Sequence, residues 1–462
     1  MEETEKNPFL AGPVFKPLLN FMLPVLLANF LQAMYSAVDL MVIGRFANAD
    51  TIQLANAAVG TGSMIMVMVT YVITGLAMGT TVVLGQYIGA KDRNGASKVI
   101  GSAICIFIVL AVGLTVIMEI LAPTFATLMN APSVEMTTLY LRICCGGLVF
   151  ITAYNVISGI FRGIGNSKLP LLFVGIACVV NIALDLITVC ILHWDVAGVA
   201  ISTITAQAVS VILSLVVIRK TPLPFDVSAK LIRFHAGFSS KILKAGIPLA
   251  FQDLLTNLSF VVINSVANQL GPDATAWAGI ASGYSVDNKL TVFTMIIPTA
   301  FLQSMAVFTA QNVGAGNRER IQKGLRYMLM SAVCVGVVLA LLCEFGGSVM
   351  ARIFTNDTET IYYAAQYLKG YAVDCLVCTS MLTLLGYFNG CGHSTFVLIQ
   401  GLIGSFIVRI PVILLLQNYD GVTLTHLVLG CASATVASLL ICIGYYIIKM
   451  KKNTMYPISM CS

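Results

Sequence analysis

Residues 85–93 read Gly85-Gln86-Tyr87-Ile88-Gly89-Ala90-Lys91-Asp92-Arg93, and residues 310–318 repeat the pattern as Ala310-Gln311-Asn312-Val313-Gly314-Ala315-Gly316-Asn317-Arg318. A second motif, Phe161-Arg162-Gly163-Ile164-Gly165-Asn166-Ser167, returns as Phe388-Asn389-Gly390-Cys391-Gly392-His393-Ser394. Pro24 has a counterpart in Pro248, and the offset stays between 224 and 227 residues. The chain therefore contains two copies of one unit. Such duplication is typical of membrane carriers, in which a site between two related bundles opens to either side in turn.

The composition places both copies in a membrane. Hydrophobic residues make up 58% of the 462 residues and charged residues 10%, and the mean hydropathy is +0.91. A chain this apolar cannot present an ordinary water-facing surface. Apolar runs long enough to cross about 30 Å of hydrocarbon lie at 17–41, 56–80, 96–121, 137–160, 168–192, 196–218, 244–268, 276–304, 322–345, 361–388, 395–416 and 425–448.

These runs predict an all-α integral membrane protein with twelve transmembrane helices in two pseudo-symmetric six-helix bundles. The expected domains are an N-terminal lobe at 1–218, a basic linker at 219–243 and a C-terminal lobe at 244–462. Lys and Arg gather on one side of the predicted membrane, so the positive-inside rule predicts a multi-pass protein of the bacterial inner membrane with both termini cytoplasmic. The net charge of +6 fits this basic side and requires no nucleic acid partner.

Two acidic side chains inside predicted spans point to a cation site, because a carboxylate in the bilayer is costly. On the first span Gln32, Tyr35 and Asp39 recur at helical spacing and form a polar stripe. On the fifth span Asn181 and Asp185 are one helical turn apart. Such stripes face protein or water rather than lipid.

The depth of these residues in the membrane supports the same site. Asp39 and Asp185 come late in outward-running spans, whereas Tyr140 and Thr203 come early in inward-running spans. All four are therefore expected at a similar depth of the first copy. The alternative is that either Asp is hydrogen-bonded within the helix bundle, but two acids on converging stripes favour a cation site.

The second copy lacks this acidic pair, since the position equivalent to Asp39 is Ile263. Asp253 and Asn257 share one face of its first span and are the candidates for contact with a substrate. Mutual ion pairing is expected for four further charged residues whose charges cancel, Asp287, Lys289, Asp374 and Arg409.

The repeated loops are expected to be turns at the helix ends. Gly89 and Gly165, like Gly314 and Gly392, would permit tight turns there, and neighbouring basic side chains would lie at the headgroup boundary. No GxxxxGK[ST] motif occurs, and the histidines have no metal-ligand spacing. The sequence therefore indicates no catalytic residues, and the protein is not expected to be an enzyme.

Taken together, several motifs resemble those of bacterial members of the MATE (multidrug and toxic compound extrusion) family over essentially the whole chain. The similarity rests on Pro24 fifteen residues before Asp39-Leu40-Met41-Val42-Ile43-Gly44-Arg45, on Gly85-Gln86, on Arg162-Gly163-Ile164-Gly165-Asn166-Ser167, on Asn181-Ile182-Ala183-Leu184-Asp185, and on 310–320. The resemblance implies an antiporter that exports amphipathic, often cationic drugs or toxic compounds in exchange for H⁺ or Na⁺ by alternating access. No other cofactor and a monomeric protein are expected.

The resemblance also implies roles for individual residues. The cation-binding residues would be Asp39, Tyr140, Asn181, Asp185 and Thr203. Na⁺, if it is the coupling ion, would bind at Asp39, Asn181 and Asp185. Candidate substrate-binding residues are Gln32, Tyr35, Asp253 and Asn257.

A mechanism follows as a hypothesis. The two Asp residues would share a proton or hold a cation as a coupled pair, and neutralisation would let the first helix bend at Pro24, where proline interrupts the backbone ladder. Two other functions remain open. One is a flippase for a lipid-linked saccharide or other lipid-like substrate; the other is a receptor or channel, which would have no need of acids confined to one lobe.

Overall fold

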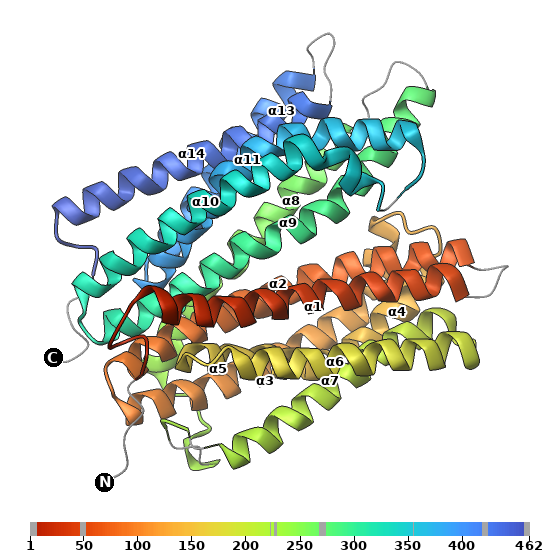
Figure 1. Ribbon diagram of the computed structural model, residues 1–462. Coiled ribbons are helices and arrows are strands. Elements are labelled where there is room, and N and C mark those ends of the chain that lie inside the picture. The colour runs from red at the N-terminus through yellow and green to blue at the C-terminus, as the bar shows by residue number, and fades with distance from the viewer. Residues whose placement is uncertain are drawn as a thin grey trace. The chain divides into compact units, whose positions relative to one another are not determined.

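The computed structural model describes residues 7–46, 52–221, 223–225, 229–267, 274–353, 355–417 and 424–456, and the side chains of 261–289 lie outside that description. Every regular element within these ranges is helical (Figure 1). Composition explains this outcome, because a chain in hydrocarbon must satisfy its backbone N–H and C=O groups internally, and a helix does so within one segment.

The helices follow the predicted spans. In the first half they are α1 (Phe15–Phe46), α2 (Ile52–Gly89), α3 (Arg93–Leu128), α4 (Val134–Gly146), α5 (Leu148–Ile164), α6 (Lys168–Asp185), the π-helix η1 (Leu186–Ile191), α7 (Asp195–Lys220) and the 3₁₀-helix η2 (Ala229–Leu231). In the second half they are α8 (Ala236–Ala267), α9 (Ala274–Gly314), α10 (Arg318–Ala351), α11 (Thr358–Gly390), α12 (Ser394–Leu402), the π-helix η3 (Ile403–Arg409), α13 (Ile410–Gln417) and α14 (Leu424–Lys451).

Length and composition mark most of these helices as membrane spans. Among the described residues, 10 helical segments are long and apolar enough to cross a membrane, and α4 with α5 forms an eleventh that is bent by 51°. The bend lies at Gly147, between the ends of the two helices. The remaining predicted span, 244–268, coincides with α8 as far as Ala267, and residue 268 lies outside the described residues. Asp253 and Asn257 lie on this helix.

The chain forms two compact units. The N-terminal unit is Leu27–Ala250, and the C-terminal unit combines Met1–Leu26 with Phe251–Ser462. The chain passes between them inside α1 and inside α8, in each case two residues after a proline, Pro24 or Pro248. The predicted lobes, 1–218 and 244–462 with a linker at 219–243, stay a prediction.

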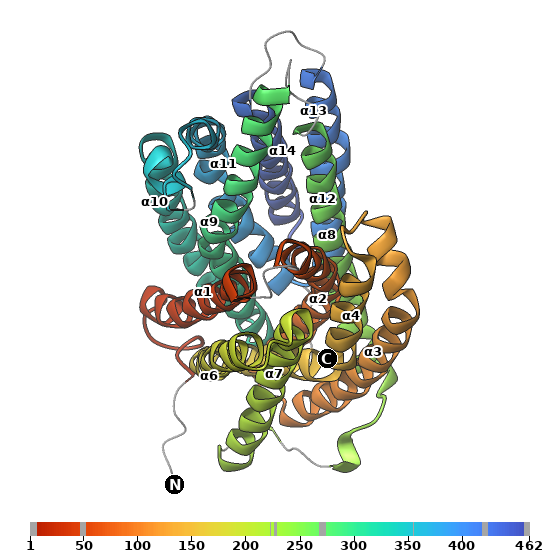
Figure 2. The same cartoon turned by 90° about the vertical axis from the view of Figure 1, so that its right-hand side faces the viewer.

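Each unit is built around one deeply buried helix. In the N-terminal unit α2 packs against α3, α4 and α5. In the C-terminal unit α11 packs against α9, α10 and α14 (Figure 2). In the windows that span the membrane, α2 and α11 are the most buried helices of their units.

The predicted turns at the helix ends are present in both pairs of loops, but the place of the left-handed residue differs. Gly165 and Gly392 both adopt the left-handed conformation, with φ of 97° and 84°. Gly89 and Gly314 do not, because they are the last residues of α2 and α9. The left-handed residues lie two positions later, at Lys91 with φ 58° and Gly316 with φ 71°. Gly89 and Gly314 thus lie in the predicted turns, and the left-handed residue follows two positions after each.

Candidate functional site: a buried acidic cluster in the N-terminal unit

Asp39 lies in the last third of α1, and its side chain is buried, with 7% exposed. The Thr203 hydroxyl of α7 donates to Asp39 Oδ2 over 3.4 Å, and it also lies 3.0 Å from the Val199 carbonyl. The single hydroxyl proton is thus shared between two acceptors. One long hydrogen bond satisfies a buried carboxylate poorly.

Asn181 and Asp185 lie one turn apart on α6, and they are 1% and 0% exposed. Both interact with the carboxyl group of Asp39. The π-helix η1 begins at the next residue, and its Thr188 hydroxyl lies 3.1 Å from that of Ser202 on α7. Single π-turns inside helices often occur at functional sites. Here the π-turn follows directly on the buried acid.

The polar atoms of this cluster are largely unsatisfied. Within the described residues, Asp39 Oδ1, both carboxylate oxygens of Asp185 and both polar atoms of the Asn181 amide are buried and make no hydrogen bond. An unsatisfied buried group costs about 1–3 kcal/mol. Most of these atoms are oxygen acceptors, and a group of acceptors with few donors is suited to a proton or to a hard cation, which prefers oxygen ligands.

The cluster contains few of the side chains, His, Cys, Asp and Glu, that bind metal ions tightly. In the part of the chain that the structure describes, no group of three or more His, Cys, Asp or Glu is placed to hold a metal ion. The cluster instead offers two carboxylates, one amide oxygen and the Thr203 hydroxyl. This set fits Na⁺ as well as a shared proton.

Tyr140 on α4 lies beside the cluster, since it interacts with Asp39 and is 4% exposed. Its ring packs on Gly62 of α2, where a Cβ would lie 3.1 Å from Cε1 and 3.2 Å from Cγ of the tyrosine. Only glycine at position 62 leaves room for the ring in this place.

Gln32 and Tyr35 precede Asp39 on α1 and are half-buried. Gln207 of α7 donates its amide to the Tyr35 hydroxyl over 3.5 Å. Tyr35 also interacts with Gln32 and with Asp39. The predicted substrate residues of the first lobe therefore adjoin the acidic cluster.

Asp253 and Asn257 lie on α8 in the C-terminal unit and are half-buried. The Asn257 amide donates to the main-chain carbonyl of Asp253 over 2.8 Å. This bond leaves the Asp253 carboxyl group uninvolved.

Asp374 and Arg409, also in the C-terminal unit, are buried at 4% and 9% exposure. Thr435 donates to Asp374, and Arg409 Nη1 donates to the Ser259 hydroxyl over 2.8 Å. The Arg409 guanidinium also lies over the Phe260 ring. The two charges act on each other, and each has a neutral hydrogen-bond partner, so ion pairing among the four charged residues stays a prediction. Asp287 and Lys289 lie outside the described side chains.

Comparison with known proteins gives the family. The family model described as MatE matches residues 24–187 and 248–415 of this chain. The chain belongs to the MatE family. The two matched segments begin at Pro24 and Pro248, so the family unit coincides with the sequence repeat.

Relatives and solved structures agree with this membership. The chain is 25% identical over 467 residues to the "Probable multidrug resistance protein YoeA" of Bacillus subtilis strain 168, covering 98% of each chain. It is 24% identical over 433 residues to the "Multidrug export protein MepA" of Staphylococcus aureus strain MSSA476, covering 92% of each. A structure described as an outward-facing conformation of a multidrug resistance MATE family transporter superposes with a TM-score of 0.88 at 20% identity, covering 98% of this chain and 99% of the other.

These findings confirm that the protein is a MATE family efflux transporter. They also confirm the predicted fold class, an all-α membrane protein with twelve transmembrane helices in two related bundles. The chain is accordingly a multi-pass membrane protein.

Three residues beside the acidic cluster were not predicted from the sequence: Gly62, Thr188 and Ser202. A signal existed for Gly62, because Gly60-Thr61-Gly62-Ser63 is a run of small residues, which lets helices approach closely. Thr188 and Ser202 had no comparable signal, since isolated hydroxyl residues in a membrane helix usually bond to their own backbone.

Proposed function

We propose that this MatE family protein is a secondary active antiporter that exports amphipathic, often cationic compounds in exchange for H⁺ or Na⁺. The observation that carries the proposal is the buried cluster of Asp39, Asp185 and Asn181, in which every polar side-chain atom except Asp39 Oδ2 lacks a hydrogen-bond partner among the described residues. The names of the relatives, a probable multidrug resistance protein and a multidrug export protein, support the substrate class.

The coupling step takes place at the acidic cluster. Two negative charges buried together are costly, so a proton or a metal cation neutralises part of the pair. A proton would be shared by Asp39 and Asp185 as one coupled system. Na⁺ would instead bind both carboxylates together with the amide oxygen of Asn181 and the hydroxyl of Thr203. Tyr140 packs beside the site and limits access to it.

The ion gradients of a bacterial membrane supply enough energy for this exchange. One pH unit is worth about 1.4 kcal/mol per proton, and 100 mV adds about 2.3 kcal/mol per charge moved. One inward cation per cycle can therefore sustain a gradient of a neutral substrate on the order of a hundredfold or more.

The conformational step is bending of α1 at Pro24. Proline removes one backbone hydrogen bond and leaves a soft point within the helix. Neutralising Asp39 changes the preferred environment of the outer half of α1, which lies beyond Pro24. Bending at this point would alternate access to the substrate between the two sides of the membrane.

Substrate binding would involve Gln32 and Tyr35 near the acidic cluster and Asp253 and Asn257 on α8. The Asp253 carboxyl suits a cationic group, and the tyrosine ring suits an apolar or cationic one. We further propose that the protein works as a monomer in the bacterial inner membrane, with both termini cytoplasmic.

The test is transport of a fluorescent lipophilic cation in proteoliposomes under a pH gradient or a Na⁺ gradient, imposed separately. Export should follow one gradient and disappear in Asp39→Asn. The matched control is Glu119→Gln, because Glu119 is a partly exposed acid of α3 that faces Arg142 at 3.9 Å. Wild-type protein that moves the cation under neither gradient would contradict the proposal and favour a lipid-like substrate.

A further inference from the structure

Arg320, near the start of α10, makes a dense set of hydrogen bonds to main-chain carbonyl groups. Its Nε donates to Phe9 over 2.7 Å and its Nη1 to Gly12 over 2.7 Å. Its Nη2 lies within 3.2 Å of three more carbonyls, those of Pro8, Ala11 and Pro13. All three guanidinium nitrogens are thus engaged by one short segment, Asn7–Pro13, which we call the N-terminal strap.

Two other anchors hold the strap to the same loop region. The Asn7 amide donates to Gln311 over 3.0 Å, and the Asn312 amide donates to the Phe9 carbonyl over 3.1 Å. The Phe9 ring is 2% exposed and packs edge-on against Phe21 and Phe308. The strap is therefore fixed to the junction of α9 and α10, which is the second copy of the repeated loop motif.

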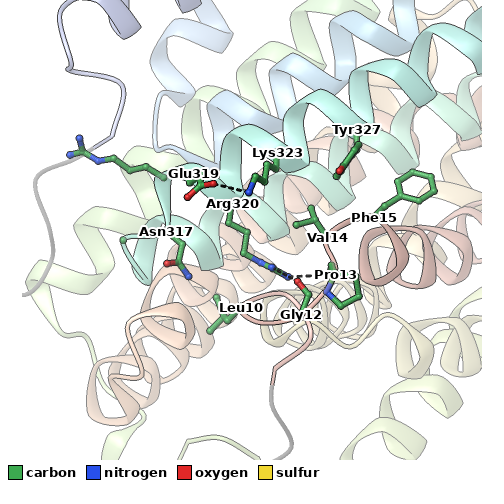
Figure 3. A pocket seen from close by; sticks show the side chains of 12 residues that line it. Leu10, Gly12, Pro13, Val14, Phe15, Asn317, Glu319, Arg320, Lys323 and Tyr327 are labelled. Carbon is green, nitrogen blue, oxygen red and sulfur yellow. Dashed lines mark hydrogen bonds and ion pairs between the residues drawn. The ribbon is translucent and has the colours of Figure 1, made fainter.

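The outer side of the strap borders an open pocket and is not packed against other described side chains. A pocket of about 770 Å³ lies there, lined by the strap residues Leu10, Gly12 and Pro13 and by the first turns of α10. Figure 3 shows the Arg320 side chain reaching across to Gly12 and Pro13, while Lys323 turns to Glu319. Among the described residues, Arg320 is the side chain that hydrogen-bonds to the strap from this side.

The strap leads directly into α1, and the first turns of that helix are packed within the C-terminal unit. Leu18, Phe21 and Val25 are all nearly fully buried. After Leu26 the helix belongs to the N-terminal unit. One end of α1 is thus anchored beside α10, and the other end carries Asp39.

The second copy anchors its crossing helix with different residues. Before and within the first turns of α8, the His235 backbone N–H bonds to the Ser102 hydroxyl, and Lys241 donates to the Tyr87 hydroxyl over 2.7 Å. Tyr87 belongs to the first copy of the loop motif. Both helices that pass between the units are therefore anchored at their starts. The anchors differ, because the first copy has Gly95 at the position equivalent to Arg320.

We propose that Arg320 is a positioning residue for transport: by clamping the N-terminal strap to α10, it fixes the start of α1, so that bending at Pro24 moves the Asp39 end of the helix. The proposal rests on the proposed antiport function. Arg320 does not touch substrate or the coupling ion. Its loss should slow the conformational step and leave substrate affinity unchanged.

The variants for the test are Arg320→Gln and Arg320→Lys, with Lys323→Gln as the matched control. Lysine keeps the charge but has a compact head with three donors, so it cannot reach carbonyls spread along the strap. Lys323 lines the same pocket and pairs with Glu319 over 2.7 Å. The full-length protein is compared in nanodiscs by hydrogen–deuterium exchange and in proteoliposomes by transport.

The strap amides of Phe9, Leu10 and Ala11, which donate to Asn7, should exchange at least about tenfold faster in both Arg320 variants, because several bonds of about 1 kcal/mol each are lost. The maximal transport rate should fall at least about fivefold with KM unchanged. Lys323→Gln should match wild type in both assays. If Arg320→Gln does not fold, Arg320→Lys decides.

Two results would overturn the proposal. If hydrogen exchange of the strap amides is unchanged in the variants, Arg320 does not hold the strap. If the strap amides exchange faster but the transport rate stays normal, the contact does not serve transport. Failure of the wild type under both ion gradients is a separate outcome, because it would contradict the antiport function itself and remove the clamp's role in transport, whatever the exchange data show.

Discussion

Replacing Gly62 by alanine tests the packing of the cation site without touching a polar group. A Cβ at this position would lie within 3.2 Å of three ring atoms of Tyr140, and the nearest of them is closer than the 3.0 Å limit of real Cβ contacts. Restoring an ordinary contact of at least 3.4 Å moves the ring by more than 0.4 Å. Because Tyr140 is 4% exposed, its surroundings must move with it.

The magnitude follows from the cost of overpacking, about 1–3 kcal/mol for an added methyl group in a filled site. If that strain shifts Tyr140 away from Asp39, cation-driven transport should fall about fivefold to a hundredfold, at 1.4 kcal/mol for each factor of ten. The assay is initial-rate export in proteoliposomes at several cation concentrations. The expected change is a weaker dependence on the coupling cation.

Gly60→Ala is the matched control, since position 60 lies on the same helix and a Cβ there would meet nothing within 4 Å. That variant should transport normally and be slightly more stable, because alanine favours a helix over glycine by about 1 kcal/mol. Equal transport by the two alanine variants would refute the role given to the contact between Gly62 and Tyr140.

Four further outcomes are expected. Asp185→Asn should abolish gradient-driven export at normal yield and melting temperature; export at the wild-type rate would remove Asp185 from the site. Thr203→Val should weaken the response to the cation about threefold to tenfold through one lost hydrogen bond, whereas Thr203→Ser should keep it, as dose–response curves would reveal. Asp253→Asn should weaken transport of a lipophilic cation more than that of a neutral analogue, and equal effects on both would contradict substrate contact. Burial lowers the pKa of His393, which lies between the Tyr445 hydroxyl and the Met455 carbonyl. The unfolded chain then takes up this proton first, so thermal stability should fall as the pH drops below about 6.5, with a shallower slope in His393→Gln.

Much of the fold could be predicted because periodicity and composition are strong signals in a membrane. The predicted spans coincide with helices, and the doubled motifs correspond to the two segments that match the family. The bend between α4 and α5 was not predicted, although Gly146-Gly147 marks it in retrospect. The π-turns of η1 and η3 could not be predicted either, since they arise from packing and have no distinct composition.

The candidate site could be predicted where it depends on helical spacing. Asp39, Asp185 and Thr203 meet because spacing and depth fix the face and the level of each residue. The support around them depends on side-chain packing, as at Gly62, which a linear pattern does not encode. Arg320 was expected at the headgroup boundary, but its partners are main-chain carbonyls of a distant segment, and main-chain acceptors leave no trace in the residue types.

The central claim, exchange of a substrate for a cation at Asp39 and Asp185, is tested most directly by running the transporter in reverse. Proteoliposomes loaded with the lipophilic cation and a pH- or Na⁺-sensitive dye are diluted into substrate-free buffer with no ion gradient imposed. Outflow of substrate should drive H⁺ or Na⁺ inward in the wild type, with no ion movement in Asp39→Asn. Substrate outflow unaccompanied by either ion, or the same ion flux in the variant, would contradict antiport at this site.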